Sequence, residues 1–250
     1  MLAIISPSKT QDFSQCDVDI FSQTRQIESS NELIGILKNK SKSQISKLMS
    51  LSEKLSELNF ERFQKFQLPF TLKNAKQAIL AFKGDVYNGI NAPDLSNEDL
   101  EFAQGKVRML SGLYGVIRPL DLIQPYRLEM GTKLSNEKGS DLYKYWGSDI
   151  SNVLNDDESD LIVNLASNEY FKAIDKDTLN ANILDIVFKE KKGDAYKVIG
   201  IHAKRARGLM VNYMIRNRLE NPEELKDFSD EGYRFDKDQS SEASWVFLRG

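Results

Sequence analysis

Residues 105–131, GKVRMLSGLYGVIRPLDLIQPYRLEMG, constrain the fold more than any other part of the chain. They combine four glycines, two prolines and three arginines with many apolar residues. Gly112 and Gly115 permit positive φ and close backbone approach, so they predict a tight turn. Pro119 forces the preceding Arg118 into an extended conformation. The stretch therefore indicates a turn between core elements.

Two interpretations of this stretch stay open. In the first, it is a loop that carries surface arginines between core elements. In the second, a hairpin exposes backbone N–H groups that receive a phosphate or another anion, and nearby arginines complete the site. Arg127 and Glu129 lie two residues apart, so on a strand both would project from one face.

The charge of the chain is segregated along its length. The formal net charge is −3, so the overall balance gives no argument for a nucleic-acid partner. However, residues 105–133 carry five basic and two acidic side chains, and residues 203–218 carry five basic side chains and no acidic one. This pattern allows a basic cleft on an acidic protein.

Composition excludes several classes of protein. No apolar run approaches the roughly 20 residues that a membrane span needs, and the apolar start is too short for a secretory segment. We therefore expect a cytoplasmic protein without a membrane partner. Cys16 is the single cysteine and His202 the single histidine. We accordingly expect no disulfide, no metal site and no cofactor.

Three polar turns each follow a segment that is typical of a buried strand. They are the turn with Lys9 after residues 2–5, the turn with Lys83 and Asp85 after residues 77–82, and the turn with Asn168 and Glu169 after residues 161–165. Ligands favour the carboxyl ends of strands in α/β sheets. These turns are therefore candidates for one shared site.

Helical periodicity predicts helices over 28–66, 141–154 and 204–219. Serines at 30, 41 and 52 are candidate N-caps, and Ser96 with Asp99 resembles a capping box. Lys204, Arg205 and Arg207 would lie at the positive end of the last helix dipole, where a bound anion would compensate them. A final edge strand is expected over 244–248.

The alternation of strand and helix patterns predicts one α/β (α+β) domain over residues 1–250, with a mixed central sheet flanked by helices. Six further blocks, with 105–131, resemble the YaaA family of bacterial peroxide-stress proteins. They are IISPSKTQDF near the start, AILAFKGDVYNGI at 78–90, LYKYWG at 142–147, NLASNEYF at 164–171, AKRARGLM at 203–210 and EGYRFDKDQSS at 231–241. They run in order along essentially the whole chain.

The resemblance implies a family-specific fold with a basic cleft and a helix-hairpin-helix-like element, which would occupy about 97–124. Its hairpin would be 111–115, between helices at 97–104 and 119–123. The resemblance also implies DNA binding and protection from peroxide by limiting free intracellular iron and DNA damage.

Two functions follow as alternatives. The first is a monomeric DNA-binding protein that contacts backbone phosphates with little sequence specificity. Its anion-binding residues would be Lys9, Lys83, Arg108, Gly112, Gly115, Arg118, Arg127, Lys204, Arg205 and Arg207. The second is an enzyme that acts on a nucleotide, nucleobase or nucleic acid. Its catalytic residues would be Lys83, Asp85, Glu129 and Glu169. Direct iron storage is disfavoured, because iron sites need clustered histidine, cysteine or carboxylate ligands.

Overall fold

A mixed sheet of eight strands forms the centre of the molecule in the computed structural model, which describes residues 1–250. The strand order is β11-β12-β9-β8-β1-β5-β6, and β10 pairs with β9. In chain order these strands are β1 (Leu2–Ile5), β5 (Val107–Ser111), β6 (Gly115–Ile117), β8 (Leu161–Leu165), β9 (Asn182–Lys192), β10 (Ala195–Lys197), β11 (Arg234–Ser241) and β12 (Ser244–Arg249).

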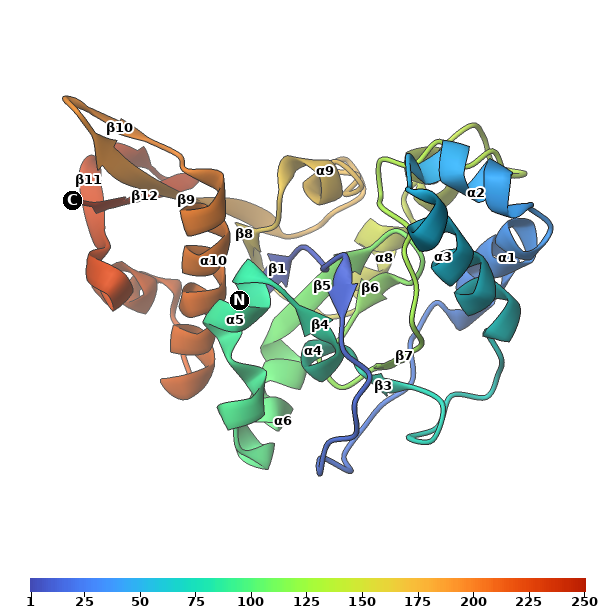
Figure 1. Cartoon of the computed structure of the whole chain (residues 1–250). Coiled ribbons are helices and arrows are strands. Elements are labelled where there is room, and N and C mark those ends of the chain that lie inside the picture. The colour runs from blue at the N-terminus through green and yellow to red at the C-terminus, as the bar shows by residue number, and fades with distance from the viewer.

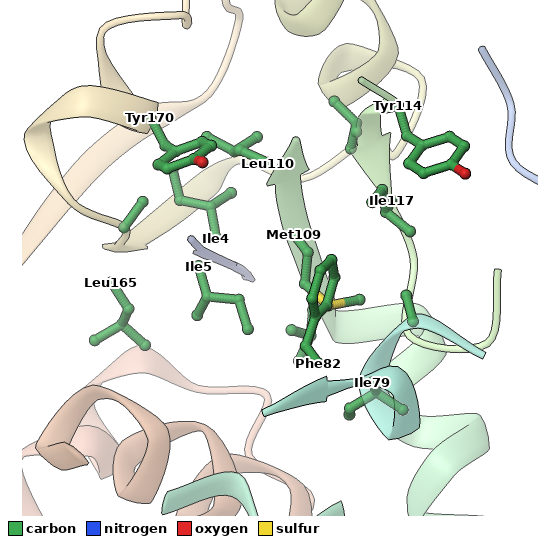
Figure 2. Packing of buried hydrophobic residues seen from close by; sticks show 14 of the residues in the cluster. Ile4, Ile5, Ile79, Phe82, Met109, Leu110, Tyr114, Ile117, Leu165 and Tyr170 are labelled. Atoms are coloured by element: carbon green, nitrogen blue, oxygen red, sulfur yellow. The ribbon is translucent and has the colours of Figure 1, made fainter. Parts of the chain in front are cut away.

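The middle of this sheet is parallel, and β1, β5 and β8 are buried along almost their whole length. β5, β1, β8, β9 and β12 run parallel to one another, whereas β6, β10 and β11 are antiparallel additions. Parallel strands are buried on both faces and therefore read as continuous apolar runs. Figure 2 shows Ile4 and Leu110 on one side of the sheet and Ile5 and Met109 on the other. The strands predicted over 2–5 and 161–165 are confirmed.

Ten α-helices and three short 3-10 helices surround the sheet. The α-helices are α1 (Ile27–Lys38), α2 (Lys42–Met49), α3 (Glu53–Lys65), α4 (Ala78–Ala81), α5 (Asp85–Ile90), α6 (Asn97–Lys106), α7 (Leu142–Trp146), α8 (Asp149–Asn155), α9 (Asn168–Phe171) and α10 (Gly200–Arg216). Figure 1 shows α1, α2 and α3 grouped at one end of the molecule, and α10 with the C-terminal strands at the other.

Two small antiparallel ribbons tie the loops to this framework. β2 (Thr10–Gln11) pairs with β4 (Phe82–Lys83), and β3 (Lys76–Gln77) pairs with β7 (Leu122–Ile123). The first ribbon places Thr10 opposite Lys83. It therefore holds the turn after β1 against the segment that leads into α5.

One hydrophobic cluster of 67 buried residues connects the sheet and the helices. A single contiguous cluster is typical of one domain. The prediction of a mixed α/β domain with helices flanking a central sheet is confirmed.

Three of the four predicted N-caps are confirmed. Ser41 caps α2 in a capping box with Gln44, Ser52 caps α3, and Ser96 with Asp99 forms the capping box of α6. The prediction for Ser30 is wrong, because α1 already begins at Ile27. The Ser30 hydroxyl instead donates to the carbonyl oxygen four residues earlier, at 2.9 Å.

Three other boundaries differ from the prediction. Residues 78–81 form α4 rather than a strand, since a short apolar run does not distinguish the two structures. The helix expected over 141–154 is two helices, because Gly147 ends α7 with φ at +47°. The strand at the C-terminus is not an edge strand, because β12 lies between β9 and β11.

The helix-hairpin-helix-like element is not found. α6 supplies the expected first helix, but residues 111–115 connect the antiparallel strands β5 and β6. Residues 122 and 123 form the strand β7 where the second helix was expected. The spacing of Gly112 and Gly115 suits a strand hairpin equally well: Gly115 takes φ +67°, and the Gly112 position is too close to the Leu128 carbonyl for a side chain.

The last long helix also begins earlier than predicted. α10 starts at Gly200, so Lys204, Arg205 and Arg207 lie beyond its first turn. Because the dipole effect falls off within the first turn, it places no penalty on these cations.

Candidate functional site

A cleft of about 630 Å³ lies at the carboxyl ends of β1 and β8, beside α5, α9 and α10. β1 and β8 are parallel, so the turns that follow them open at the same edge of the sheet. The charged residues that line the cleft are Lys9, Lys83, Asp85, Glu169, Lys204 and Arg207. All three predicted strand-end turns therefore meet in one place, and α10 adds two cations.

Two glycines bring α5 and α10 together at the side of the cleft. A Cβ atom on Gly208 would collide with the Val86 carbonyl oxygen, and one on Gly89 would lie 2.5 Å from the Arg205 carbonyl oxygen. Only glycine permits such close backbone contact. The close contact places Arg207, on α10, across from the start of α5.

The base of the cleft is fixed by hydrogen bonds between the turns after β1 and β8. The Ser167 backbone N–H donates to Ser6 Oγ at 2.8 Å, and Ser6 Oγ donates to Ser167 Oγ at 3.2 Å. From α5, the buried Tyr87 hydroxyl donates to the Ser6 carbonyl oxygen at 3.0 Å. These bonds join three segments that are far apart in the sequence at the base of the cleft.

Arg207 is the partly buried cation of the cleft that has no partner. It is partly buried, its Nε atom has no hydrogen-bond partner, and it takes part in no ion pair. Burial lowers the pKa of its guanidinium without a carboxylate to oppose the effect. The group still stays charged at neutral pH, because the ordinary pKa of arginine lies far above neutrality. An unpartnered buried donor costs about 1–3 kcal/mol, which a bound anion would offset.

The other charges of the cleft leave it positive. Its four cations (Lys9, Lys83, Lys204, Arg207) outnumber its two carboxylates (Asp85, Glu169). Lys83 has only a long contact, 3.7 Å, with Asp12 outside the cleft lining. The net positive charge, with donors on several walls, suits an anionic ligand.

A small recess next to the cleft holds a second group of charges. Glu129 forms one ion pair with Lys9 at 2.6 Å and another with Arg127 at 3.2 Å. The Arg127 Nε atom is buried without a partner. Tyr170 lines both the recess and the cleft, and burial raises the pKa of its hydroxyl. The recess therefore adds to the cleft a carboxylate, Glu129, whose charge is neutralised by two cations. It also adds one more unpaired guanidinium donor, Arg127 Nε.

Other predicted site residues lie elsewhere. Arg108 is buried and forms a two-point ion pair with Asp157, with Nε–Oδ2 at 2.7 Å and a second guanidinium nitrogen to Oδ1 at 2.8 Å. Arg118 pairs with the buried Asp121 at 2.9 Å. Both arginines have structural partners, and neither lines the cleft.

Arg205, Gly112 and Gly115 are also outside the cleft. The Arg205 guanidinium pairs with Glu231 at 2.5 Å, although Arg205 lies only two residues from Arg207 on α10. Gly112 and Gly115 belong to the buried β5–β6 hairpin. Their backbone N–H groups are therefore not at a surface that an anion could reach.

Sequence reasoning missed Ser6, Ser167 and Tyr170 as parts of the cleft. All three lie within blocks that carry the family resemblance, but their residue types gave no chemical signal. No group of three or more His, Cys, Asp or Glu side chains is arranged to hold a metal ion. No helix combines the length and apolar character that crossing a bilayer requires.

Comparison with known proteins decides the family. The model of a family described as "Peroxide stress protein YaaA" matches residues 1–239. The chain belongs to the YaaA family of peroxide-stress proteins. A UPF0246 protein from Acaryochloris marina (strain MBIC 11017) is 54% identical over 251 residues, and the match covers 100% of both chains.

The match to the YaaA family model includes all the segments that line the cleft. The turns after β1 and β8, the start of α5, and Lys204 and Arg207 of α10 all lie within the matched residues. The cleft is thus formed by parts of the chain that the family model describes.

Proposed function

We propose that this YaaA-family chain is a DNA-binding protein of the peroxide-stress response, and that DNA enters the cleft and is held there by its phosphates. The observation that carries the proposal is Arg207, a partly buried guanidinium that lines the cleft without a partner. Arginine presents several donors in a planar fork, which matches the geometry of a phosphate.

The other cations of the cleft support the same ligand. Lys9, Lys83 and Lys204 lie on three different segments around Arg207, so they can contact more than one phosphate. Contacts of this kind position a nucleic acid without reading its sequence. We therefore propose binding with little sequence preference by a cytoplasmic monomer. We also propose that the protein helps to limit free intracellular iron and DNA damage, with an indirect effect on iron.

Binding of a labelled DNA oligonucleotide across a range of salt concentrations tests this function. We expect the logarithm of affinity to fall linearly with the logarithm of salt, with a slope of about −0.9 per duplex phosphate neutralised or −0.7 per single-strand phosphate. Arg207→Gln should weaken binding at every salt concentration and make the slope shallower by about one contact. Salt-independent affinity, or affinity for one base sequence only, would overturn the proposal.

An enzymatic role is a second candidate, favoured by one observation. Asp85 lines the cleft among lysines and forms neither an ion pair nor a side-chain hydrogen bond. A free carboxylate beside cations suits general acid–base work on a bound nucleotide or nucleic acid. Asp85→Asn distinguishes the roles: a DNA-binding function keeps or gains affinity and still protects cells from peroxide, whereas an enzyme keeps affinity and loses protection.

A further inference from the structure

A second basic hollow lies beyond the cleft, between α2 and the loop that follows Met130. Its volume is about 610 Å³, and Lys40, Lys47 and Lys133 contribute its charge. No carboxylate lines this hollow. The three lysines come from three separate segments: the connection between α1 and α2, α2 itself, and the loop.

These lysines lack the partners that neighbouring lysines have. Lys42, also on α2, pairs with Glu57 at 2.6 Å, and Lys38 donates to the Phe66 carbonyl oxygen at 3.0 Å. Lys40, Lys47 and Lys133 form no ion pair and no side-chain hydrogen bond. On a chain whose net charge is −3, three uncompensated cations at one hollow form a localised positive surface.

One hydrogen bond joins a residue that lines the hollow to a residue that lines the cleft. The Gly131 backbone N–H, which lines the hollow, donates to the Glu169 carboxylate at 3.0 Å. Glu169 lines the cleft from α9. Figure 1 shows α9 between α10, which bears Arg207, and α2, which bears Lys47. A chain that leaves the cleft past Glu169 would therefore meet the lysines next.

We propose that Lys40, Lys47 and Lys133 form a second phosphate-binding station, and that a DNA strand held in the Arg207 cleft continues past Gly131 onto it. The inference rests on the proposed function, and it adds a path and a minimum length to the ligand. A lysine ammonium is a mobile point charge that contacts phosphates without demanding their orientation. The station therefore suits the repeating charge of a DNA backbone better than it suits a single small anion.

Oligonucleotide length tests the path. Single-stranded DNA of 4 and 20 nucleotides is titrated against the wild-type chain and the variant Lys40→Gln, Lys47→Gln, Lys133→Gln, at several salt concentrations. We expect the variant to lose about tenfold or more affinity for the long strand. Its salt slope should become shallower by about 2, which is three phosphates at about 0.7 each. The short strand, which fills only the cleft, should bind unchanged.

A matched variant controls for overall charge. Lys191→Gln, Lys192→Gln, Lys197→Gln removes three exposed lysines from the β9–β10 hairpin, at the far end of the molecule in Figure 1. This variant should bind both strands as the wild type does. Thermal unfolding of both variants confirms that the fold is intact, and one that does not fold is replaced by the three single substitutions.

The outcomes separate the two proposals. If the long strand binds the station variant as tightly as it binds the wild type, or if the hairpin variant loses as much affinity, the second station is wrong. If Arg207→Gln still weakens binding in that case, the proposed function stands without the station. If neither strand binds the wild type, both proposals fail. If the station variant loses the short strand equally, the lysines belong to the cleft and the path is wrong.

Discussion

Arg108 and Arg207 show how the same residue type supports the fold in one region and leaves a site open in another. Arg108, on β5, gives two hydrogen bonds to Asp157 and two more to backbone carbonyl oxygens at 2.7 Å. Arg25 adds a second cation to the same carboxylate, at 3.0 Å. Arg207 has no partner of any of these kinds. Arg25 and Arg108 are both held by Asp157 and support the fold, whereas Arg207 forms no ion pair and no side-chain hydrogen bond, which points to a ligand.

Removing Arg108 should have the largest effect on stability. Breaking a buried ion pair by removing one partner costs about 3–5 kcal/mol, because the other charge stays buried. We expect Arg108→Gln to lower the free energy of unfolding by about 3 kcal/mol, since Arg25 still compensates Asp157 in part. Urea unfolding measures the loss. DNA affinity of the folded fraction should not change, and a parallel loss of affinity would place Arg108 at the binding surface after all.

The contact between α5 and α10 gives the next largest effect. An added methyl group at Gly208 meets backbone atoms of Val86, so the two helices have to move apart. We expect Gly208→Ala to cost about 2 kcal/mol from overpacking, and also to weaken DNA binding because Arg207 moves with α10. Gly35→Ala is the control, because nothing lies within 4 Å of its added Cβ and α1 should gain about 0.5–1 kcal/mol. A stable Gly208→Ala variant would contradict the close packing.

The dependence of stability on acidic pH tests the structural role of Arg108 through its partner Asp157. Burial alone would raise the pKa of Asp157, but its bonds to Arg108 and Arg25 outweigh burial and lower it. A carboxyl with a lowered folded pKa stabilises the fold above its unfolded pKa, about 3.9. That contribution disappears as the pH falls through the lower, folded pKa. The unfolding free energy of Arg108→Gln should therefore fall less steeply than that of the wild type below about pH 4. Equal slopes would mean that Arg108 does not set this pKa.

The smallest effect is expected at Arg205. Its pair with Glu231 is largely exposed, and pairs of this kind contribute about 0–1 kcal/mol. Arg205→Gln should therefore lower the melting temperature by no more than a few degrees. A larger loss would mean that the pair is a structural requirement for α10.

Local patterns in the sequence predict the features that depend on interactions between residues close together in the chain, such as helix caps. Ser41 and Ser52 cap helices because their hydroxyls satisfy backbone donors three residues away. Lys9, Lys83 and Glu169 meet at the cleft because each follows a segment that leads into one edge of the fold. The apolar runs therefore indicate three of the segments that line the cleft, and α10 adds a fourth that they do not indicate.

Long-range partners could not be predicted in this way. Arg108 finds Asp157 at a sequence separation of 49, and Arg205 finds Glu231 at a separation of 26. Nothing near either arginine in the sequence indicates its partner, so both were expected at the site. Lys40 and Lys47 were missed for the same reason, because only the fold brings α2 beside the loop after Met130.

The most direct test compares Arg205→Gln with Arg207→Gln in one DNA-binding titration across salt. Both substitutions remove one positive charge from α10, so the net charge of the two variants is identical. We expect Arg205→Gln to bind as the wild type does, whereas Arg207→Gln should lose about tenfold in affinity and show a salt slope that is shallower by about one contact. Equal losses in the two variants, or no loss at Arg207, would contradict the claim that the unpartnered arginine of the cleft holds the DNA.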